Sequence, residues 1–163
     1  MKKIILILIM FVSLLFSYNS NDLNKFKKNR DCPKCDLSYA NLKGWDITWA
    51  DLKDANLSHA NLNGANAHRA DFSGADLSYA SCKGTNLKGV KFIGAKLVKV
   101  NFTNARIWKS NFTNAKIVKC NFKGAALGSS IFKGNNLSNS KFDSNTILYK
   151  TVFEHVKGIP KRK

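Results

Sequence analysis

The sequence predicts an all-β solenoid, in which the chain turns a corner every five residues and stacks its coils around an apolar core. From Cys35 to Tyr149 the chain divides into 23 consecutive pentapeptides, and the central residue is Leu, Ile or Phe in 21 of them. A small residue, usually Ala, stands two positions before most of these centres. Residues two positions apart on a strand point to the same face, so each unit turns both side chains inward.

A period of five is incompatible with a continuous strand and with an α-helix. On a continued strand the residue two positions after each centre would also point inward, whereas here the next inward residue follows after three. On a helix the apolar stripe would drift around the 3.6-residue turn. The chain must therefore turn after every unit.

A second period of ten residues indicates an even number of units in each coil. From Leu87 onward, aliphatic and Phe centres alternate along the chain. Two positions after every second centre, Gly or Asn recurs. These residues are Gly64, Gly74, Gly84, Gly94, Asn104, Asn114, Gly124 and Gly134.

The repeated pattern Ala-(Asp/Asn)-Leu-x-x closely resembles the motif of the pentapeptide-repeat family. Residues 55–59 (Ala-Asn-Leu-Ser-His) and 75–79 (Ala-Asp-Leu-Ser-Tyr) are representative units, and the resemblance covers about 115 residues. It implies four units per coil, which is a right-handed quadrilateral β-helix of about six coils.

Four faces per coil assign every centre to a column. Phe centres fall on two opposite faces, so we expect Phe to pack against Phe across a filled interior without a ligand cavity. Gly or Asn at the corners after these faces predicts type II turns, whose third residue has a positive φ. The other two corners carry bulky residues that avoid positive φ, so type I turns are expected there. These bulky residues are Tyr39, Trp49, His59, Arg69, Tyr79, Lys99, Lys109 and Lys119.

The N-terminus has the pattern of a signal peptide. Two lysines precede 13 mainly apolar residues, 4–16, which is shorter than the ~20 residues that a membrane-spanning helix needs. We expect a signal peptide at 1–20, cleaved at about 17–20, and an exported protein that is periplasmic or extracellular. An uncleaved N-terminal anchor in the membrane is the alternative.

The remaining boundaries follow from the repeat pattern. Residues 21–34 are expected to form a linker or cap, and residues 35–149 the repeat solenoid. Residues 150–163 are expected to form a C-terminal cap, which includes Phe153, and a basic tail. Trp45 replaces a small residue near the N-terminus, and we interpret it as a lid over that end of the core.

Cys32 and Cys35 form a CxxC pair beside the first repeat, which can be a redox pair, half of a zinc site or a disulfide. The three His residues lie on different repeats, so no metal site is expected. A disulfide that caps the first coil is favoured in an exported chain, and resemblance to exported relatives with a similar CxxC start supports it. Cys82 and Cys120 occupy inward positions two coils apart and are expected to be buried thiols.

The charge is distributed unevenly along the chain. The formal net charge is +17, and residues 87–163 carry 16 Lys and Arg but only Asp143 and Glu154 as acidic residues. The best-known members of the resembled family imitate duplex DNA to protect DNA gyrase, and such mimicry requires an acidic surface. A DNA mimic that binds gyrase is therefore not expected.

Five lysines in the basic half are the candidate anion-binding residues. Lys96 and Lys116 precede centres of one face, and Lys99 and Lys119 follow them, one coil apart. Stacked like charges repel each other, and an anionic partner would relieve this cost. The alternative is that solvated lysines only keep the solenoid soluble. Lys109 is the fifth candidate.

The sequence favours a non-catalytic protein without cofactors. The acidic residues occupy positions that the repeat itself prefers, and no His lies near a Ser or Cys in the repeat grid. We expect a scaffold in the cell envelope whose basic half contacts anionic lipid or cell-wall polymer. Nucleic-acid binding by the same face is the alternative, with Trp49 and Trp108 as exposed rings. The macromolecular partner is not specified by the sequence, and an end-to-end homodimer is a further expectation.

Overall fold

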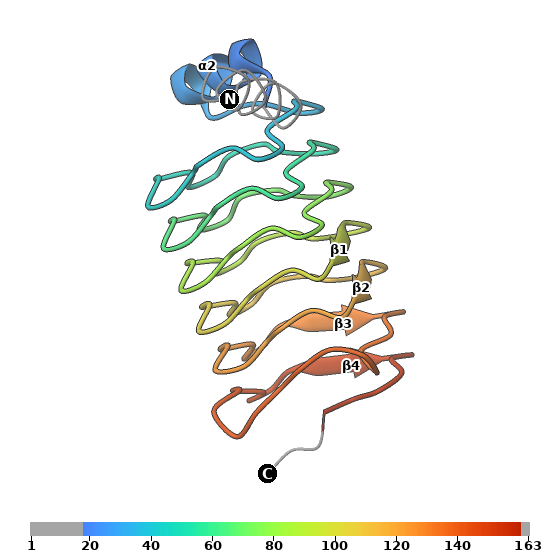
Figure 1. The fold of residues 1–163 in the computed structure, drawn as a ribbon. Coiled ribbons are helices and arrows are strands. Elements are labelled where there is room, and N and C mark those ends of the chain that lie inside the picture. The colour runs from blue at the N-terminus through green and yellow to red at the C-terminus, as the bar shows by residue number, and fades with distance from the viewer. Residues whose placement is uncertain (1–17, 161–163) are drawn as a thin grey trace, which may run out of the picture.

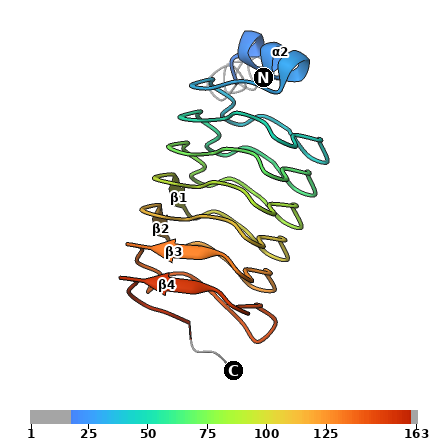
Figure 2. The same cartoon turned by 180° about the vertical axis from the view of Figure 1, so that it is seen from behind.

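The computed structural model describes residues 18–160, which form one helix and a stack of parallel coils (Figures 1 and 2). The elements are α2 (Ser20–Asn29), β1 (Lys96–Val98), β2 (Lys116–Val118), β3 (Ile131–Lys133) and β4 (Val152–Glu154). Between them the coils are held by isolated parallel bridges. The predicted all-β, right-handed quadrilateral β-helix is confirmed.

Each coil takes 20 residues, which is four pentapeptides. Strand β1 pairs with β2 so that Lys96 lies beside Lys116 and Leu97 beside Ile117. The isolated bridges repeat this spacing from Asp31, which pairs with Asp51, up to Lys141. The residue before each centre therefore lies directly over its equivalent in the preceding coil, and about six coils fit between Asp31 and Lys157.

The interior consists of the predicted columns. Phe112 stacks between Phe92 and Phe132, with ring centroids 5.0 and 4.5 Å apart. Across the interior, Phe112 meets Phe122 edge to face at 6.4 Å. Edge-to-face and offset stacked pairs are the favoured arrangements of aromatic rings. The prediction that Phe packs against Phe from opposite faces is confirmed.

The prediction of type I turns at the bulky corners is wrong. Tyr39, Trp49 and Lys119 have φ of 60°, 62° and 54°, as in the type II corners that carry Gly or Asn. The reason is the ladder between coils, because the corner N–H must point along the axis: Tyr39 N donates to Ser58 O at 2.9 Å. The ladder requires the same backbone at these corners and outweighs the cost of about 1 kcal/mol per left-handed residue.

The repeat frame slips by one residue near the C-terminus, which corrects the predicted centre at Ile147. Ile147 is 45% exposed, and Leu148 takes the inward position against the core. The coil then continues beyond Tyr149, because Phe153 pairs with Phe132 and their rings stack at 5.5 Å. The C-terminal cap expected to include Phe153 is therefore misplaced, because β4 is part of a coil.

Helix α2 covers the N-terminal end of the core. Its Phe26 is buried and stacks on Trp45 with ring centroids 6.3 Å apart. Trp45, the predicted lid, is itself half-buried beneath this helix. The helix begins at its N-cap Asn19, whose side chain accepts hydrogen bonds from the N–H groups of Asn21 and Asp22. The five-residue repeat does not predict this helix, because the helix lies before the first repeat and is held by contacts such as Phe26–Trp45 with residues far along the chain.

The predicted signal peptide lies almost entirely in residues 1–17, outside the described residues, as does the end of the basic tail at 161–163. Within residues 18–160, no helix has the length and apolar character needed to cross a bilayer.

Candidate anion-binding face

Four of the five candidate lysines lie together on one side of the rod. Lys96 and Lys116 are register partners in β1 and β2, and both are exposed. Lys99 and Lys119 occupy the corners that follow these strands, and Lys99 N donates to Val118 O at 2.7 Å. We call Lys96, Lys99, Lys116 and Lys119 the lysine face.

The two lysines of the first coil in this face contact the coil before them. Lys96 Nζ lies 2.8 Å from Asp76 Oδ2. Partial burial raises the pKa of Asp76, but hydrogen bonds from Lys96 and Ser78 outweigh this effect, so the pKa is lowered overall. Lys99 Nζ lies 4.9 Å from the centroid of the Tyr79 ring. Lys96 is thus already paired with a carboxylate, and Lys99 rests on an aromatic face.

The two lysines of the next coil have no such support. Below Lys116 and Lys119 lie Lys96 and Lys99, and the sequence has no Asp or Glu between Asp76 and Asp143. Among the ion pairs of residues 18–160, none includes Lys116 or Lys119. Their charges are the uncompensated part of the lysine face.

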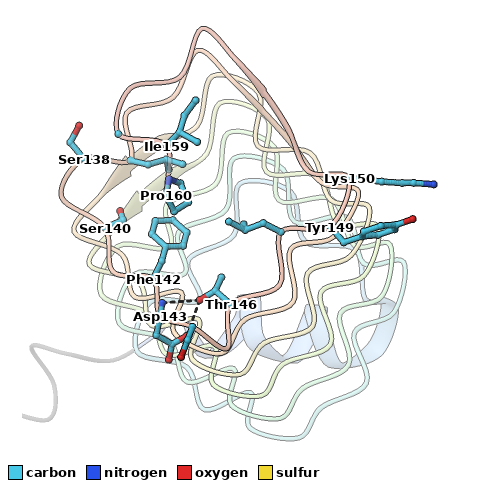
Figure 3. A pocket seen from close by; sticks show the side chains of 13 residues that line it. Ser138, Ser140, Phe142, Asp143, Thr146, Tyr149, Lys150, Ile159 and Pro160 are labelled. Atoms are coloured by element: carbon cyan, nitrogen blue, oxygen red, sulfur yellow. Dashed lines mark hydrogen bonds between the residues drawn. The ribbon is translucent and has the colours of Figure 1, made fainter. Parts of the chain in front are cut away.

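Lys109 does not belong to this face. It follows the centre Ile107, two units of the coil away from the corners of Lys99 and Lys119, and its column continues through Ser129 to Lys150. In the end-on view of Figure 3, Lys150 projects on the side of the rod opposite Ser138. Lys109 is therefore a candidate anion-binding residue at a separate corner, as its position in the repeat predicts.

A stack of rings extends the lysine face toward the N-terminus, and the sequence pattern did not show its packing. His59 lies flat between Tyr39 and Tyr79, with ring centroids 4.5 and 4.8 Å apart. Tyr39 and Tyr79 are 38% and 48% exposed. The sequence contains these aromatic residues at a spacing of 20. Their rings stack because all corners of this column have the same backbone conformation. The corner therefore presents rings in one half of the rod and charge in the other.

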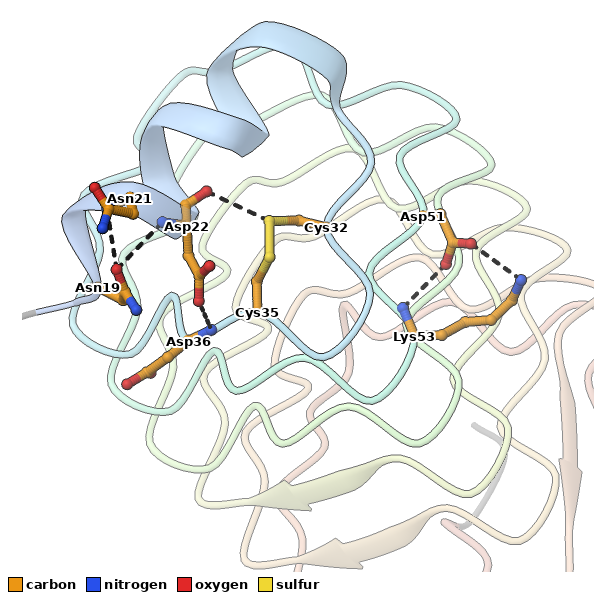
Figure 4. The surroundings of a disulfide bond; sticks show 8 residues. All are labelled: Asn19, Asn21, Asp22, Cys32, Cys35, Asp36, Asp51 and Lys53. Atoms are coloured by element: carbon orange, nitrogen blue, oxygen red, sulfur yellow. Dashed lines mark hydrogen bonds and ion pairs between the residues drawn. A yellow bond between two sulfur atoms is a disulfide. The ribbon is translucent and has the colours of Figure 1, made fainter.

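Cys32 and Cys35 form a disulfide at the first corner of the solenoid, with S–S 2.02 Å (Figure 4). Cys32 takes a centre position, and Cys35 N donates to Cys32 O at 3.2 Å. Helix α2 packs directly beside this bond: Asp22 O lies 3.4 Å from Cys32 Sγ, and Asp22 Oδ2 accepts from Asp36 N at 2.8 Å. The disulfide thus closes the first corner, and Asp22 of the capping helix packs against it.

The other two cysteines are free and buried. Burial raises the pKa of the Cys120 thiol to about 12, and burial together with the neighbouring Cys120 also raises the pKa of Cys82. Such thiols are poor nucleophiles at neutral pH. Across residues 18–160, no group of three or more His, Cys, Asp or Glu side chains is placed to hold a metal ion.

The family comparison agrees with this geometry. The sequence profile described as pentapeptide repeats matches 8 copies, over residues 55–94, 95–134 and 110–144. The chain belongs to the pentapeptide repeat family. Pentapeptide repeat proteins are in general non-catalytic repeat proteins. Among curated proteins, no significant sequence relative is found.

Two solved pentapeptide repeat structures resemble this pentapeptide repeat protein over most of the solenoid. Rfr23 from the cyanobacterium Cyanothece 51142 is 24% identical, with a TM-score of 0.58, and the match covers 79% of this chain and 98% of Rfr23. A protein of the Arabidopsis thaliana thylakoid lumen is 29% identical, with a TM-score of 0.59, over 64% of this chain and 70% of its own. These likenesses support the fold.

The two tryptophans considered for nucleic-acid binding differ in exposure. Trp49 is 63% exposed and carries the Arg69 guanidinium 4.6 Å from its ring centroid. Trp108 is half-buried, and its ring lies against Gly128, where an added Cβ would stand 2.1 Å from Trp108 Cζ3. The expectation that both rings are exposed is wrong for Trp108, because the absent side chain of Gly128 lets the ring fold onto the backbone.

Proposed function

We propose that this pentapeptide repeat protein is a non-catalytic scaffold of the cell envelope, whose lysine face binds an anionic surface formed by lipid headgroups or cell-wall polymer. The observation that carries the proposal is the uncompensated charge of Lys116 and Lys119. These residues lie over Lys96 and Lys99 with no carboxylate between them. An anionic surface supplies the missing counter-charge, and each Lys near such a surface contributes about 1 kcal/mol.

Two features support a location outside the cytoplasm. The Cys32–Cys35 disulfide is of a kind that persists in oxidising compartments. The basic start and apolar run of residues 1–16 have the length of a signal peptide. A tethered or secreted scaffold in the envelope is consistent with both features.

The same lysines make the protein better suited to bind nucleic acid than to imitate it. A mimic of duplex DNA needs an acidic surface, whereas no Asp or Glu occurs between Asp76 and Asp143. We therefore do not propose gyrase as a partner. Binding of duplex DNA by the lysine face is the second candidate, and it would show a steep dependence on salt concentration.

The experiment begins with expression of the full chain in a bacterial host, followed by cell fractionation and mass analysis of the N-terminus. We expect a shortened chain in the envelope or medium. The recovered protein is then titrated with phosphatidylglycerol vesicles, neutral phosphatidylcholine vesicles, purified wall polymer and duplex DNA over a salt series. Binding to the anionic envelope surfaces, with weaker binding to DNA, is the expected result.

A charge-matched pair of variants tests the face itself. Lys116→Glu/Lys119→Glu should weaken vesicle binding at least about thirtyfold, because two contributions of about 1 kcal/mol each are lost and two negative charges that repel the surface are added. Lys83→Glu/Lys123→Glu makes the same change of net charge on another face and should retain most of the binding. Equal losses in both variants would refute the lysine face, and a preference for DNA together with an unprocessed chain would support the second candidate.

We also propose that the C-terminal end joins two copies of the chain. This end contains a hollow of about 1030 Å³ lined by Phe142, Leu148 and Tyr149, among others (Figure 3). Tyr149 and Ile159 are 61% and 50% exposed. Tyr149→Lys should lower the mass observed by sedimentation to that of a monomer, whereas Tyr79→Lys on the side of the rod should not. A wild-type protein that stays monomeric at all concentrations would exclude this dimer interface.

A further inference from the structure

A second surface lies at the corner diagonally opposite the lysine face. It is a groove of about 520 Å³, and it runs along the axis over several coils. We call it the Gly89 groove, after the residue at its floor. Its main residues are Trp49, Asp51, Lys53, Arg69, Asp71, Gly89, Lys91 and Lys109.

The groove exists because one corner residue in the column lacks a side chain. Trp49, Arg69, Gly89 and Lys109 follow each other at 20-residue spacing, and all have positive φ. Consecutive corners are about 4.8 Å apart, so Arg69 and Lys109 are separated by roughly 10 Å with Gly89 between them. A Cβ at Gly89 would stand 3.3 Å from Arg69 Cγ. The column therefore lacks a side chain between two cations, and the stem of Arg69 borders this vacant position.

The cations around this vacant position are arranged to receive an anion. The Arg69 guanidinium is stacked on the Trp49 ring at 4.6 Å, which limits its orientations before a ligand arrives. No ion pair within residues 18–160 includes Arg69 or Lys109. Lys91, two residues after Gly89, contributes a third positive charge while it also contacts Asp71 at 3.3 Å. Arg and Lys together are the usual donors to phosphate.

The other half of the groove is polar and internally neutralised. Lys53 Nζ lies 3.2 Å from Asp51 Oδ2 (Figure 4) and 3.9 Å from Asp71 Oδ2. Hydrogen bonds with Asp51 raise the pKa of Lys53. Partial burial raises the pKa of Asp71, but hydrogen bonds from Ser73 and Lys91 outweigh this effect and lower it. Ionised carboxylates accept hydrogen bonds from hydroxyl groups, and the exposed Trp49 ring offers an apolar surface beside them.

We propose that the Gly89 groove binds a phosphorylated polyol or sugar. The phosphate occupies the vacant position between Arg69 and Lys109, and the hydroxyl groups of the organic part donate to Asp51 and Asp71. The groove volume is within the range of small-molecule sites. The site is independent of the proposed binding of surfaces by the lysine face, since the two share no residue.

The test follows the backbone amide of Gly89 by NMR during titration of the processed protein. The probes are glycerol 1-phosphate, inorganic phosphate, glycerol and a poly(glycerol phosphate) chain. We expect saturable shifts confined to the groove, with glycerol 1-phosphate bound more tightly than inorganic phosphate and glycerol not bound. Tighter binding of the polymer than of glycerol 1-phosphate would identify a polymer as the source of the phosphate, and equal affinity would identify a free phosphate ester.

Two variants separate occupation of the groove from general charge. Gly89→Gln fills the vacant position without altering net charge and should weaken glycerol 1-phosphate binding about tenfold, as should Arg69→Gln. Gly84→Gln places the same side chain at a corner with open space and should bind as the wild type does. Unchanged binding in Gly89→Gln would overturn the proposal, and so would NMR shifts that follow ionic strength without saturation. Vesicle binding by the lysine face is a separate property, so its loss in Lys116→Glu/Lys119→Glu leaves this proposal intact.

Discussion

Ala126 bridges Ile147, which lies 21 residues further along the chain, whereas Asn121 bridges Lys141 at the usual spacing of 20. One extra residue is therefore accommodated between Lys141 and Ile147. The bulge is tied to the coil before it, because Asp143 Oδ1 accepts from Gly124 N at 2.9 Å. Thr146, not Asn145, takes the small inward position and donates to Phe122 O at 3.0 Å.

Deletion of Ser144 should restore the 20-residue coil. Ser144 is exposed, and the last coil already pairs in the shifted register. We expect the free energy of unfolding to change by less than about 1 kcal/mol, since exposed loops tolerate changes of length. Urea denaturation measures this change, and hydrogen exchange reports on the last coil. Loss of protection at Phe153 would show that the extra residue is needed to seat β4.

Truncation of a Phe in the middle of the stack should cost more than truncation at its end. Phe112 is fully buried with a ring stacked on each side, whereas Phe142 is only half-buried. Phe112→Ala should destabilise the protein by about 3–5 kcal/mol, because a buried cavity replaces the ring. Phe142→Ala serves as the matched control and should cost clearly less in urea denaturation. Similar losses would contradict a continuous stack.

Lys119→Gly should stabilise the solenoid. Lys119 has φ of 54°, and glycine adopts this conformation without the steric cost of a Cβ. The expected gain is about 0.5–1 kcal/mol, after allowance for the greater entropy of glycine in the unfolded chain. Lys123→Gly is the control. Lys123 does not have a positive φ, so glycine there only adds entropy to the unfolded chain and should destabilise the protein. Thermal denaturation of both variants measures these changes. A lower melting temperature in Lys119→Gly would mean that the Lys119 side chain stabilises the corner.

Reduction of the Cys32–Cys35 disulfide should loosen the N-terminal cap first. A loop of this length is expected to contribute about 2 kcal/mol by chain entropy. Helix α2 packs against the bond through Asp22. Hydrogen exchange of the reduced protein should therefore increase in α2 and the first coil, while the coils around Phe112 keep their protection. Uniform loss of protection would show that the cap and the solenoid unfold together.

The two buried thiols should make the protein less stable at alkaline pH. Their pKa values are raised by burial, that of Cys120 to about 12, from an ordinary value of 9.0. Above pH 9 the unfolded chain loses these protons while the folded chain retains them, so stability falls as pH rises. The loss is about 1.4 kcal/mol per thiol at pH 10. Urea denaturation at pH 7 and pH 10 should show a smaller difference in Cys82→Val/Cys120→Ala than in the wild type.

Most of the candidate site could be placed from the sequence, but its state of charge could not. The 20-residue period places Lys96, Lys99, Lys116 and Lys119 together. The same period places Asp76 beside Lys96 and Tyr79 beside Lys99 in adjacent coils, but it does not show that the side chains touch, because contact depends on their reach and direction. The same period places Lys109 at the diagonally opposite corner, where it stays a separate candidate for anion binding.

The strict period of five was enough to predict the solenoid, because it imposes the same local geometry on every unit, and the resemblance to the pentapeptide-repeat family added its four faces and the facing columns of Phe. The tertiary structure alone decided the left-handed backbone at Tyr39 and Trp49, the helix over Trp45 and the shift from Ile147 to Leu148. Each of these depends on hydrogen bonds or packing between residues about 20 positions apart. Contacts of this range outweigh local preferences wherever every coil must stack on the one before it.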